Sequence, residues 1–124
     1  MAIQSGIPNI STVNIIVQRL KNLLEVEKIY LQPDLSLTTL SKLVGTNNSY
    51  LSKVINQEFG KNFSTLINFY RIEHAKKLMR SQIVRINQLP NQCGFKARSS
   101  FYAAFEAITG ESPTAFMKSD KSLE

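Results

Sequence analysis

The sequence predicts an all-α fold of about seven helices, in which a long connector helix joins two helix-turn-helix units. The main observation is an internal repeat: a short apolar helix pattern, a glycine and a second helix pattern occupy residues 37–55 and again residues 86–105. Between the repeats, residues 62–80 contain neither glycine nor proline, which favours a long helix. No convincing run of alternating apolar and polar residues is bounded by turns, so no strand is predicted.

The first helix follows a segment that we expect to be flexible, residues 1–10, which contains Gly6 and Pro8. Ser11 or Thr12 can cap this helix, because a hydroxyl oxygen accepts a hydrogen bond from an N–H group of the first turn. The apolar residues of the helix recur at helical spacing: Ile15, Ile16, Leu20, Leu23 and Leu24.

The first helix-turn-helix unit is expected at about residues 36–60, after the break at Pro33. Gly45 suits a tight turn between its two helices, because glycine adopts positive φ without a steric penalty, and Gly60 ends the second helix. The expected caps are Asp34 or Ser36 for the first helix and Asn47 or Asn48 for the second, and the expected inward residues are Leu37, Leu40, Leu43, Val44, Tyr50, Leu51, Val54 and Ile55.

The connector helix, about residues 62–80, leads into the second unit, about residues 86–109. Pro90 lies in the first helix of that unit, and proline is tolerated only in the first turn, where backbone N–H groups have no partner within the helix. We therefore expect this helix to start late, near Asn87. The inward residues expected on the connector are Phe63, Leu66, Ile67, Tyr70, Ile72, Ala75, Leu78 and Met79.

A last short helix follows Gly110, with Ser112 as its cap and Pro113 at its first position. The single domain is expected to span residues 11–120, and residues 121–124 form a tail consistent with vector-derived sequence. Five aromatic residues are expected in the core by their spacing, so no base-stacking role is expected for them: Tyr50, Phe63, Phe101, Phe105 and Phe116.

The charge distribution indicates a polyanionic partner. The formal net charge is +6 and the pI is near 9.6. Residues 71–98 carry seven bases against the single acid Glu73, an excess equal to the whole net charge. Because a repeated helical unit suits a partner with a regular repeat, double-stranded DNA is the expected partner. The candidate phosphate contacts are Arg71, Lys76, Lys77, Arg80, Arg85 and Lys96.

Candidate base contacts come from the second helix of each unit, whose start and outer face enter the major groove in a helix-turn-helix. Asparagine can pair with adenine, lysine or arginine with guanine, and serine with several bases. The candidates are Asn48, Ser49, Ser52, Lys53 and Asn56 in the first unit, and Arg98, Ser99 and Tyr102 in the second.

The motifs of residues 37–116 resemble the DNA-binding domain of the AraC/XylS family of transcription regulators. They are Leu40-Ser41, Gly45, Ser49-Tyr50-Leu51-Ser52, Gly60, Phe63, Arg71-Ile72, Ala75, Leu78, Leu89, Cys93-Gly94-Phe95, Phe101, Phe105, Gly110 and Ser112-Pro113. The resemblance implies two helix-turn-helix units that bind successive major grooves, in a regulator that is often an activator. It also implies a separate sensing domain, expected outside this chain, and RNA polymerase is a further candidate partner.

The chain departs from the family pattern at Pro90 and at Ala103, where the second reading helix often carries arginine. Since this position lacks a long donor, we expect the first unit to carry more of the sequence preference and the second to serve mainly as an anchor. A non-specific architectural DNA-binding protein is the alternative, whereas a protein-binding helical bundle would leave the basic stretch unexplained.

Enzymatic and metal chemistry are not expected. The chain shows no nucleophile signature, phosphate loop or paired histidine–carboxylate motif, and no cofactor is expected. His74 is the only histidine and is expected to be a partly exposed helix residue, and Cys93 a small core residue. A single cysteine fits a reducing cytoplasm, and we expect no membrane contact, because no apolar run is long enough to span a bilayer.

Overall fold

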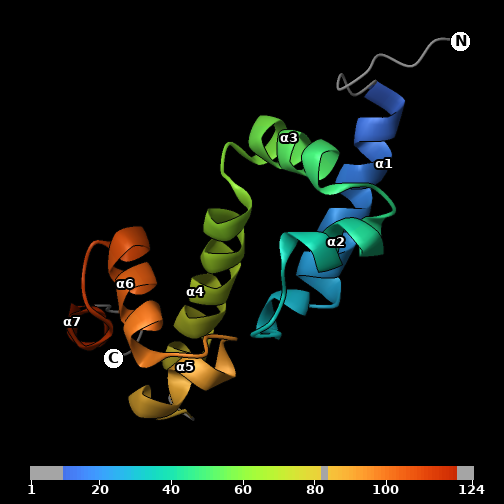
Figure 1. The fold of residues 1–124 in the computed structure, drawn as a ribbon. Helices are drawn as coiled ribbons and strands as arrows, with labels where there is room; N and C mark the ends of the chain where they lie inside the picture. The colour runs from blue at the N-terminus through green and yellow to red at the C-terminus, as the bar shows by residue number, and fades with distance from the viewer. Residues whose placement is uncertain (1–9, 82–83, 120–124) are drawn as a thin grey trace, which may run out of the picture. The chain divides into compact units, whose positions relative to one another are not determined.

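The computed structural model describes residues 10–81 and 84–119, and this part of the chain contains seven α-helices, three short π or 3-10 turns and no strand (Figure 1). The all-α prediction is confirmed. Of the segments expected at the two ends, residues 1–10 lie outside the described residues except for Ile10, and residues 121–124 lie outside them entirely. The elements are α1 (Ile10–Lys21), η1 (Asn22–Val26), η2 (Ile29–Leu31), α2 (Leu37–Val44), α3 (Asn48–Phe59), α4 (Phe63–Ser81), η3 (Ile86–Gln88), α5 (Leu89–Gln92), α6 (Arg98–Thr109) and α7 (Pro113–Ser119).

The chain divides into two compact units. Unit 1 comprises the chain up to Ile29 together with Asp34–Leu66, and unit 2 comprises Tyr30–Pro33 and the chain from Ile67 onward. The residues expected to form a connector make one continuous helix, α4, which contributes its first turn to unit 1 and the remainder to unit 2.

Unit 1 obtains its helix boundaries from local side-chain chemistry. The Ser36 hydroxyl accepts a hydrogen bond from the Thr39 N–H at 3.1 Å, and the Asn47 side chain accepts one from the Tyr50 N–H at 2.8 Å, so both helices have the expected type of cap. Gly45 ends α2 at a φ of 83°, in the left-handed region. The helix-turn-helix of this unit is therefore built as the turn residues predict.

The core of unit 1 forms where α1 packs against both α2 and α3, which also pack against each other. Helical spacing places one apolar stripe of each helix in this core. The fully buried side chains are Leu20, Leu24, Leu40, Val44, Leu51, Val54 and Ile55.

Two apolar residues expected to face inward do not. Ile15 is 52% exposed and Leu43 is 53% exposed. On α1, the buried stripe runs through Ile16 and Leu20, and the 100° step per residue turns Ile15 away from it. The same step separates Leu43 from the buried Val44. Each residue lies at the edge of an apolar stripe, where a side chain is buried only if a neighbouring helix covers it.

The predicted cap of the first helix is also wrong. Ile10 is already helical, so Ser11 and Thr12 lie inside the first turn of α1 rather than before it. At its other end α1 continues into the π turn η1, where the consecutive residues Leu23 and Leu24 are both buried.

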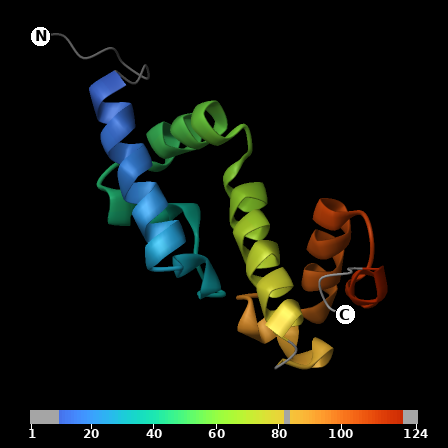
Figure 2. The same cartoon turned by 180° about the vertical axis from the view of Figure 1, so that it is seen from behind.

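Unit 2 is organised around aromatic side chains contributed by α6 and its neighbours. Phe101 and Phe105 are fully buried, with ring centroids 5.7 Å apart. Phe95 packs edge-on against Phe101 at 5.5 Å, and Phe116 of α7 packs against Phe105 at 5.4 Å. The buried face of α4 completes this core through Ile72, Ala75 and Met79. Figure 2 shows α6 and α7 side by side in this unit.

The first helix of the second unit starts late, as expected, but at Leu89 rather than near Asn87. The chain first makes the 3-10 turn η3, and Pro90 then lies in the first turn of the four-residue helix α5. Proline fits there because the missing N–H would have had no partner within the helix. Of the five aromatic residues expected in the core, Tyr50, Phe63 and Phe116 are half-buried rather than fully buried.

Cys93 is fully buried, as expected for a core residue, and burial raises the pKa of its thiol to about 12. The unfolded thiol ionises near pH 8.5. Between these two pKa values the Cys93 thiol keeps its proton in the folded protein and loses it in the unfolded chain. The free energy of unfolding should therefore fall as pH rises from about 9 to about 12, by roughly 1 kcal/mol per pH unit.

Urea unfolding at a series of pH values checks this prediction, with Cys93→Ala as the control. The variant starts from a lower stability, since it loses core volume, but its stability should fall less steeply over the same range. Identical slopes for both proteins would contradict the assignment.

Candidate nucleic-acid interface

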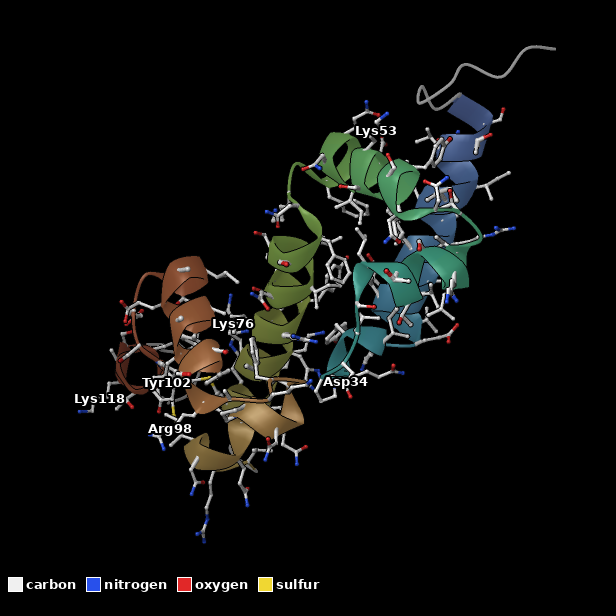
Figure 3. All side chains as sticks on the ribbon, in the orientation of Figure 1. Asp34, Lys53, Lys76, Arg98, Tyr102 and Lys118 are labelled. Atoms are coloured by element: carbon white, nitrogen blue, oxygen red, sulfur yellow. The ribbon has the colours of Figure 1, made fainter. Side chains whose placement is uncertain are left out.

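The outer face of α3 carries the candidate base contacts of unit 1. The opposite face of α3 is buried in the core of unit 1 and carries Leu51, Val54 and Ile55. Figure 3 shows Lys53 pointing away from the helix. The exposed candidates are Asn48, Ser49, Lys53 and Asn56, and Ser52 is half-buried. The helix thus brings together the side chains that were expected on one face.

Asn48, at the start of α3, is engaged within the protein. Its Nδ2 donates to the Thr38 hydroxyl at 2.9 Å, and its Oδ1 accepts from the Ser41 hydroxyl at 2.7 Å. Ser41 is only 3% exposed, and its hydroxyl lies 2.9 Å from a second acceptor, the Thr38 carbonyl. Both polar atoms of the Asn48 amide therefore hold the start of α3 against α2.

The other asparagine candidate on α3 has a local partner. Asn56 Nδ2 donates to the Ser52 carbonyl at 2.9 Å, one helical turn earlier. The amide lies along the exposed face of the helix, and its oxygen is the acceptor that it can present outward.

The outer face of α6 carries the candidates of unit 2. Phe101, Ala104 and Phe105 face the core, while Arg98, Ser99 and Ala103 are exposed and Tyr102 is half-buried. Arg98 Nη2 donates to the Tyr102 hydroxyl at 3.1 Å, and the guanidinium lies over the ring, 5.0 Å from its centroid (Figure 3). The face therefore offers one cation together with a serine hydroxyl and a tyrosine.

The starts of α3 and α6 differ. Asn47 caps α3 with its side chain, whereas the residue before α6 is Ala97, which has no side-chain acceptor. The N–H groups of the first turn of α6 are consequently not capped by that residue. Such N–H groups, next to Lys96 and Arg98, suit an anionic acceptor.

The basic residues expected to contact phosphate fall into two groups. Lys77, Arg80, Arg85 and Lys96 are exposed. Lys76 is half-buried, forms an ion pair with Glu73 at 2.8 Å and lies 6.0 Å from the ring centroid of Phe116. The exposed group carries the charge that an external polyanion can reach.

Arg71, also expected to contact phosphate, is a packing residue of unit 2. Its Nε donates to the Tyr30 carbonyl at 2.7 Å and its Nη2 to the Gln32 carbonyl at 3.0 Å. The guanidinium also lies over Phe95, 5.3 Å from the ring centroid. Burial lowers the pKa of Arg71, yet an arginine remains charged at neutral pH. These contacts tie the segment before α2 to α4.

The sequence reasoning missed Arg19. Its Nη1 donates to the Val44 carbonyl at 2.7 Å, which satisfies a backbone acceptor at the end of α2. Its partner lies 25 residues away in the sequence, so no local pattern could have identified the contact.

The described residues contain no group of three or more metal-ligating side chains. His74 is a half-buried residue of α4, as expected, and its ring packs edge-on against Tyr30, with ring centroids 6.0 Å apart. None of the helices between residues 10 and 119 combines the length and the hydropathy needed to cross a bilayer.

Comparison with known proteins identifies a matching family model and similar proteins. A family model described as a helix-turn-helix domain matches residues 40–119. A Staphylococcus aureus protein named an uncharacterized HTH-type transcriptional regulator is 35% identical over 89 residues, which are 72% of this chain and 12% of that protein. The uncharacterized transcriptional regulatory protein YesN of Bacillus subtilis is 32% identical over 89 residues, 69% of this chain and 24% of that protein.

A solved structure shows the same fold. The C-terminal domain of AraT, a response regulator from Geobacillus stearothermophilus, matches with a TM-score of 0.74 and 26% identity, over 86% of this chain and 85% of that one. The chain spans no more than 24% of the length of either curated relative described above.

Proposed function

This chain belongs to the AraC/XylS-type helix-turn-helix family of transcription regulators, whose domain binds DNA, and from that membership we propose that it recognises specific sequences in double-stranded DNA. The observation that supports the proposal is the similar length and burial pattern of α3 and α6. Each is a 12-residue helix with one apolar face buried in its own unit and a polar face exposed, on which a base lies in the first half of the helix, Lys53 in α3 and Arg98 in α6. Two such helices can read two successive major grooves.

The proposal assigns base contacts to polar side chains on the exposed faces of α3 and α6. In unit 1, Ser49, Ser52 and Lys53 read bases, and Asn56 contributes its amide oxygen. Asn48 positions α3, because its amide is bonded to α2. In unit 2, Arg98 and Ser99 are the readers, and Tyr102 supports them.

The family is one of DNA-binding regulator domains rather than a class of enzymes.

Phosphate contacts are proposed for the exposed bases of unit 2, with Lys96 beside the uncapped start of α6. Such contacts fix register and raise affinity without reading sequence. Lys76 is a weaker candidate, because it is half-buried. The proposed phosphate contacts are therefore Lys77, Arg80, Arg85 and Lys96.

The length of the relatives supports a wider proposal. Since the chain spans 12% and 24% of two regulators, we propose that it acts as one domain of a longer regulator whose sensing domain lies outside it. That regulator would work in the cytoplasm, where its DNA lies, and would activate transcription through RNA polymerase.

Selection of binding sites from random duplexes tests the proposal. We expect an enriched site made of two half-motifs about one helical turn apart, roughly 10–10.5 bp. Its affinity should exceed that for unrelated DNA by roughly 10³ or more at fixed salt. Binding without an enriched motif would contradict sequence-specific recognition and indicate an architectural DNA-binding protein.

Arg98→Ala sharpens the test. If Arg98 reads a base, the variant should relax preference at one position and lose about 1–3 kcal/mol of binding free energy on the selected site. Lys118→Ala is the matched control, because it removes the same charge from an exposed position on α7. An equal loss on all sequences would make Arg98 a phosphate contact instead.

A further inference from the structure

Arg98 and Tyr102 form a pair on the exposed face of α6. They lie one helical turn apart, where side chains at positions i and i+4 meet. Two independent contacts join them: the 3.1 Å hydrogen bond from Arg98 Nη2 to the Tyr102 hydroxyl, and the guanidinium above the ring at 5.0 Å. The hydroxyl fixes one end of the guanidinium while the ring supports its plane.

The tyrosine half of the pair is anchored in the core of unit 2. The Tyr102 ring packs edge-on against Phe101, with centroids 5.7 Å apart and an interplanar angle of 84°. Phe101 is fully buried between Phe95 and Phe105. The ring that supports Arg98 is thus held by packed aromatic side chains, although Arg98 itself is exposed.

This arrangement matters because a free arginine side chain is flexible and must be ordered before its planar fork can meet a base edge. The bond to the Tyr102 hydroxyl uses one of the five N–H donors of the guanidinium, and guanine needs two, for O6 and N7. Enough donors therefore remain once the side chain is held.

We propose that Tyr102 is a positioning residue that holds the Arg98 guanidinium ready to read one guanine, so that the two residues act as a single recognition element. The inference rests on the proposed function and deepens it. In this proposal Tyr102 acts through Arg98 rather than on a base of its own: its oxygen accepts from the guanidinium, and its half-buried ring lies beneath it.

A double-mutant cycle on the selected DNA site tests the proposal. The readout is the preference for each base pair, measured by competition between the site and singly substituted duplexes. Arg98→Ala should lower the preference for one guanine about tenfold. Tyr102→Phe, which removes only the hydroxyl, should lower the preference at the same base pair about threefold. The double variant should match Arg98→Ala, because the hydroxyl has nothing left to position.

Two further variants separate positioning from charge and from folding. Tyr102→Leu should lower the same preference more than Tyr102→Phe, because it also removes the ring. Arg98→Lys keeps the charge but loses the planar fork that Tyr102 holds, so the guanine preference should fall and should no longer respond to Tyr102→Phe, while the salt dependence of binding stays unchanged. Thermal unfolding verifies folding, and Tyr102→Phe keeps the ring that packs on Phe101.

The outcomes distinguish this inference from the function on which it rests. Losses that add in the double variant, or fall at different base pairs, would show that Tyr102 contacts DNA independently and would overturn the positioning role. An enriched motif that is indifferent to Tyr102→Phe and Tyr102→Leu would overturn it as well, while leaving sequence-specific binding intact. The absence of any enriched motif would instead contradict the proposed function.

Discussion

Replacing Gly94 by alanine should lower the free energy of unfolding of unit 2 by about 3 kcal/mol, since two costs combine. Gly94 has a φ of +90°, where a side chain strains the backbone by about 1–2 kcal/mol. A Cβ at this position would also lie 2.5 Å from the Tyr30 carbonyl oxygen and 3.0 Å from Leu31 Cα. Both are backbone atoms, so they cannot move aside as a side chain would. Urea unfolding measures the loss.

Gly110→Ala is the matched control for this prediction. Gly110 has nearly the same φ, +87°, but a Cβ there meets nothing within 4 Å. The control should therefore lose only the backbone term, about 1 kcal/mol. If the two variants lost equal stability, the close approach of the Tyr30 segment to Gly94 would not contribute, and the packing described for unit 2 would be wrong.

Replacing Arg71 by methionine should cost about 2 kcal/mol of stability. Methionine retains an apolar stem of similar length, but the hydrogen bonds to the Tyr30 and Gln32 carbonyls and the stacking on Phe95 are lost. The carbonyl of Tyr30, a buried residue, would lose its bond from the guanidinium, and a buried acceptor left unsatisfied is costly. Urea unfolding again provides the measurement.

Lys77→Met on the same helix is the control, because Lys77 is exposed and its loss should change stability by less than about 0.5 kcal/mol. A second readout separates packing from phosphate contact. Under conditions where the protein is folded, Arg71→Met should leave the salt dependence of DNA binding unchanged. A decrease of about one in the slope of log K against log salt would show that Arg71 also contacts phosphate.

Under our proposals, the two units share DNA recognition more evenly than Ala103 and Pro90 suggest. The sequence predicts unit 2 mainly as an anchor, because Ala103 removes a long donor from its reading helix. Pro90 does not disturb the unit, since it occupies the first turn of α5. The support of Arg98 by Tyr102 gives α6 one well-positioned donor group. Under our proposals, unit 2 therefore reads a guanine as well as anchoring the domain.

Much of the fold could be predicted because its signals are local. Ser36 and Asn47 cap their helices by bonding to N–H groups three residues later, and Gly45 ends α2 by adopting positive φ. The Arg98–Tyr102 pair was local too, at i and i+4, and could have been found from that spacing. Periodicity located the apolar stripes but not their edges, so Ile15 and Leu43 were misplaced.

The sequence by itself determined the helices, the caps of α2 and α3, the two turns and the set of polar residues on the outer faces of α3 and α6. These depend on interactions that span at most one or two helical turns. Only the tertiary structure decided which of the candidate DNA-contacting residues already bond within the protein. Asn48 bonds to residues seven and ten positions away, and Arg71 to carbonyls 39 and 41 positions away. A basic or amide side chain has the same local sequence pattern whether it packs within the protein or faces solvent, and only the acceptor that folding brings near it identifies a packing residue.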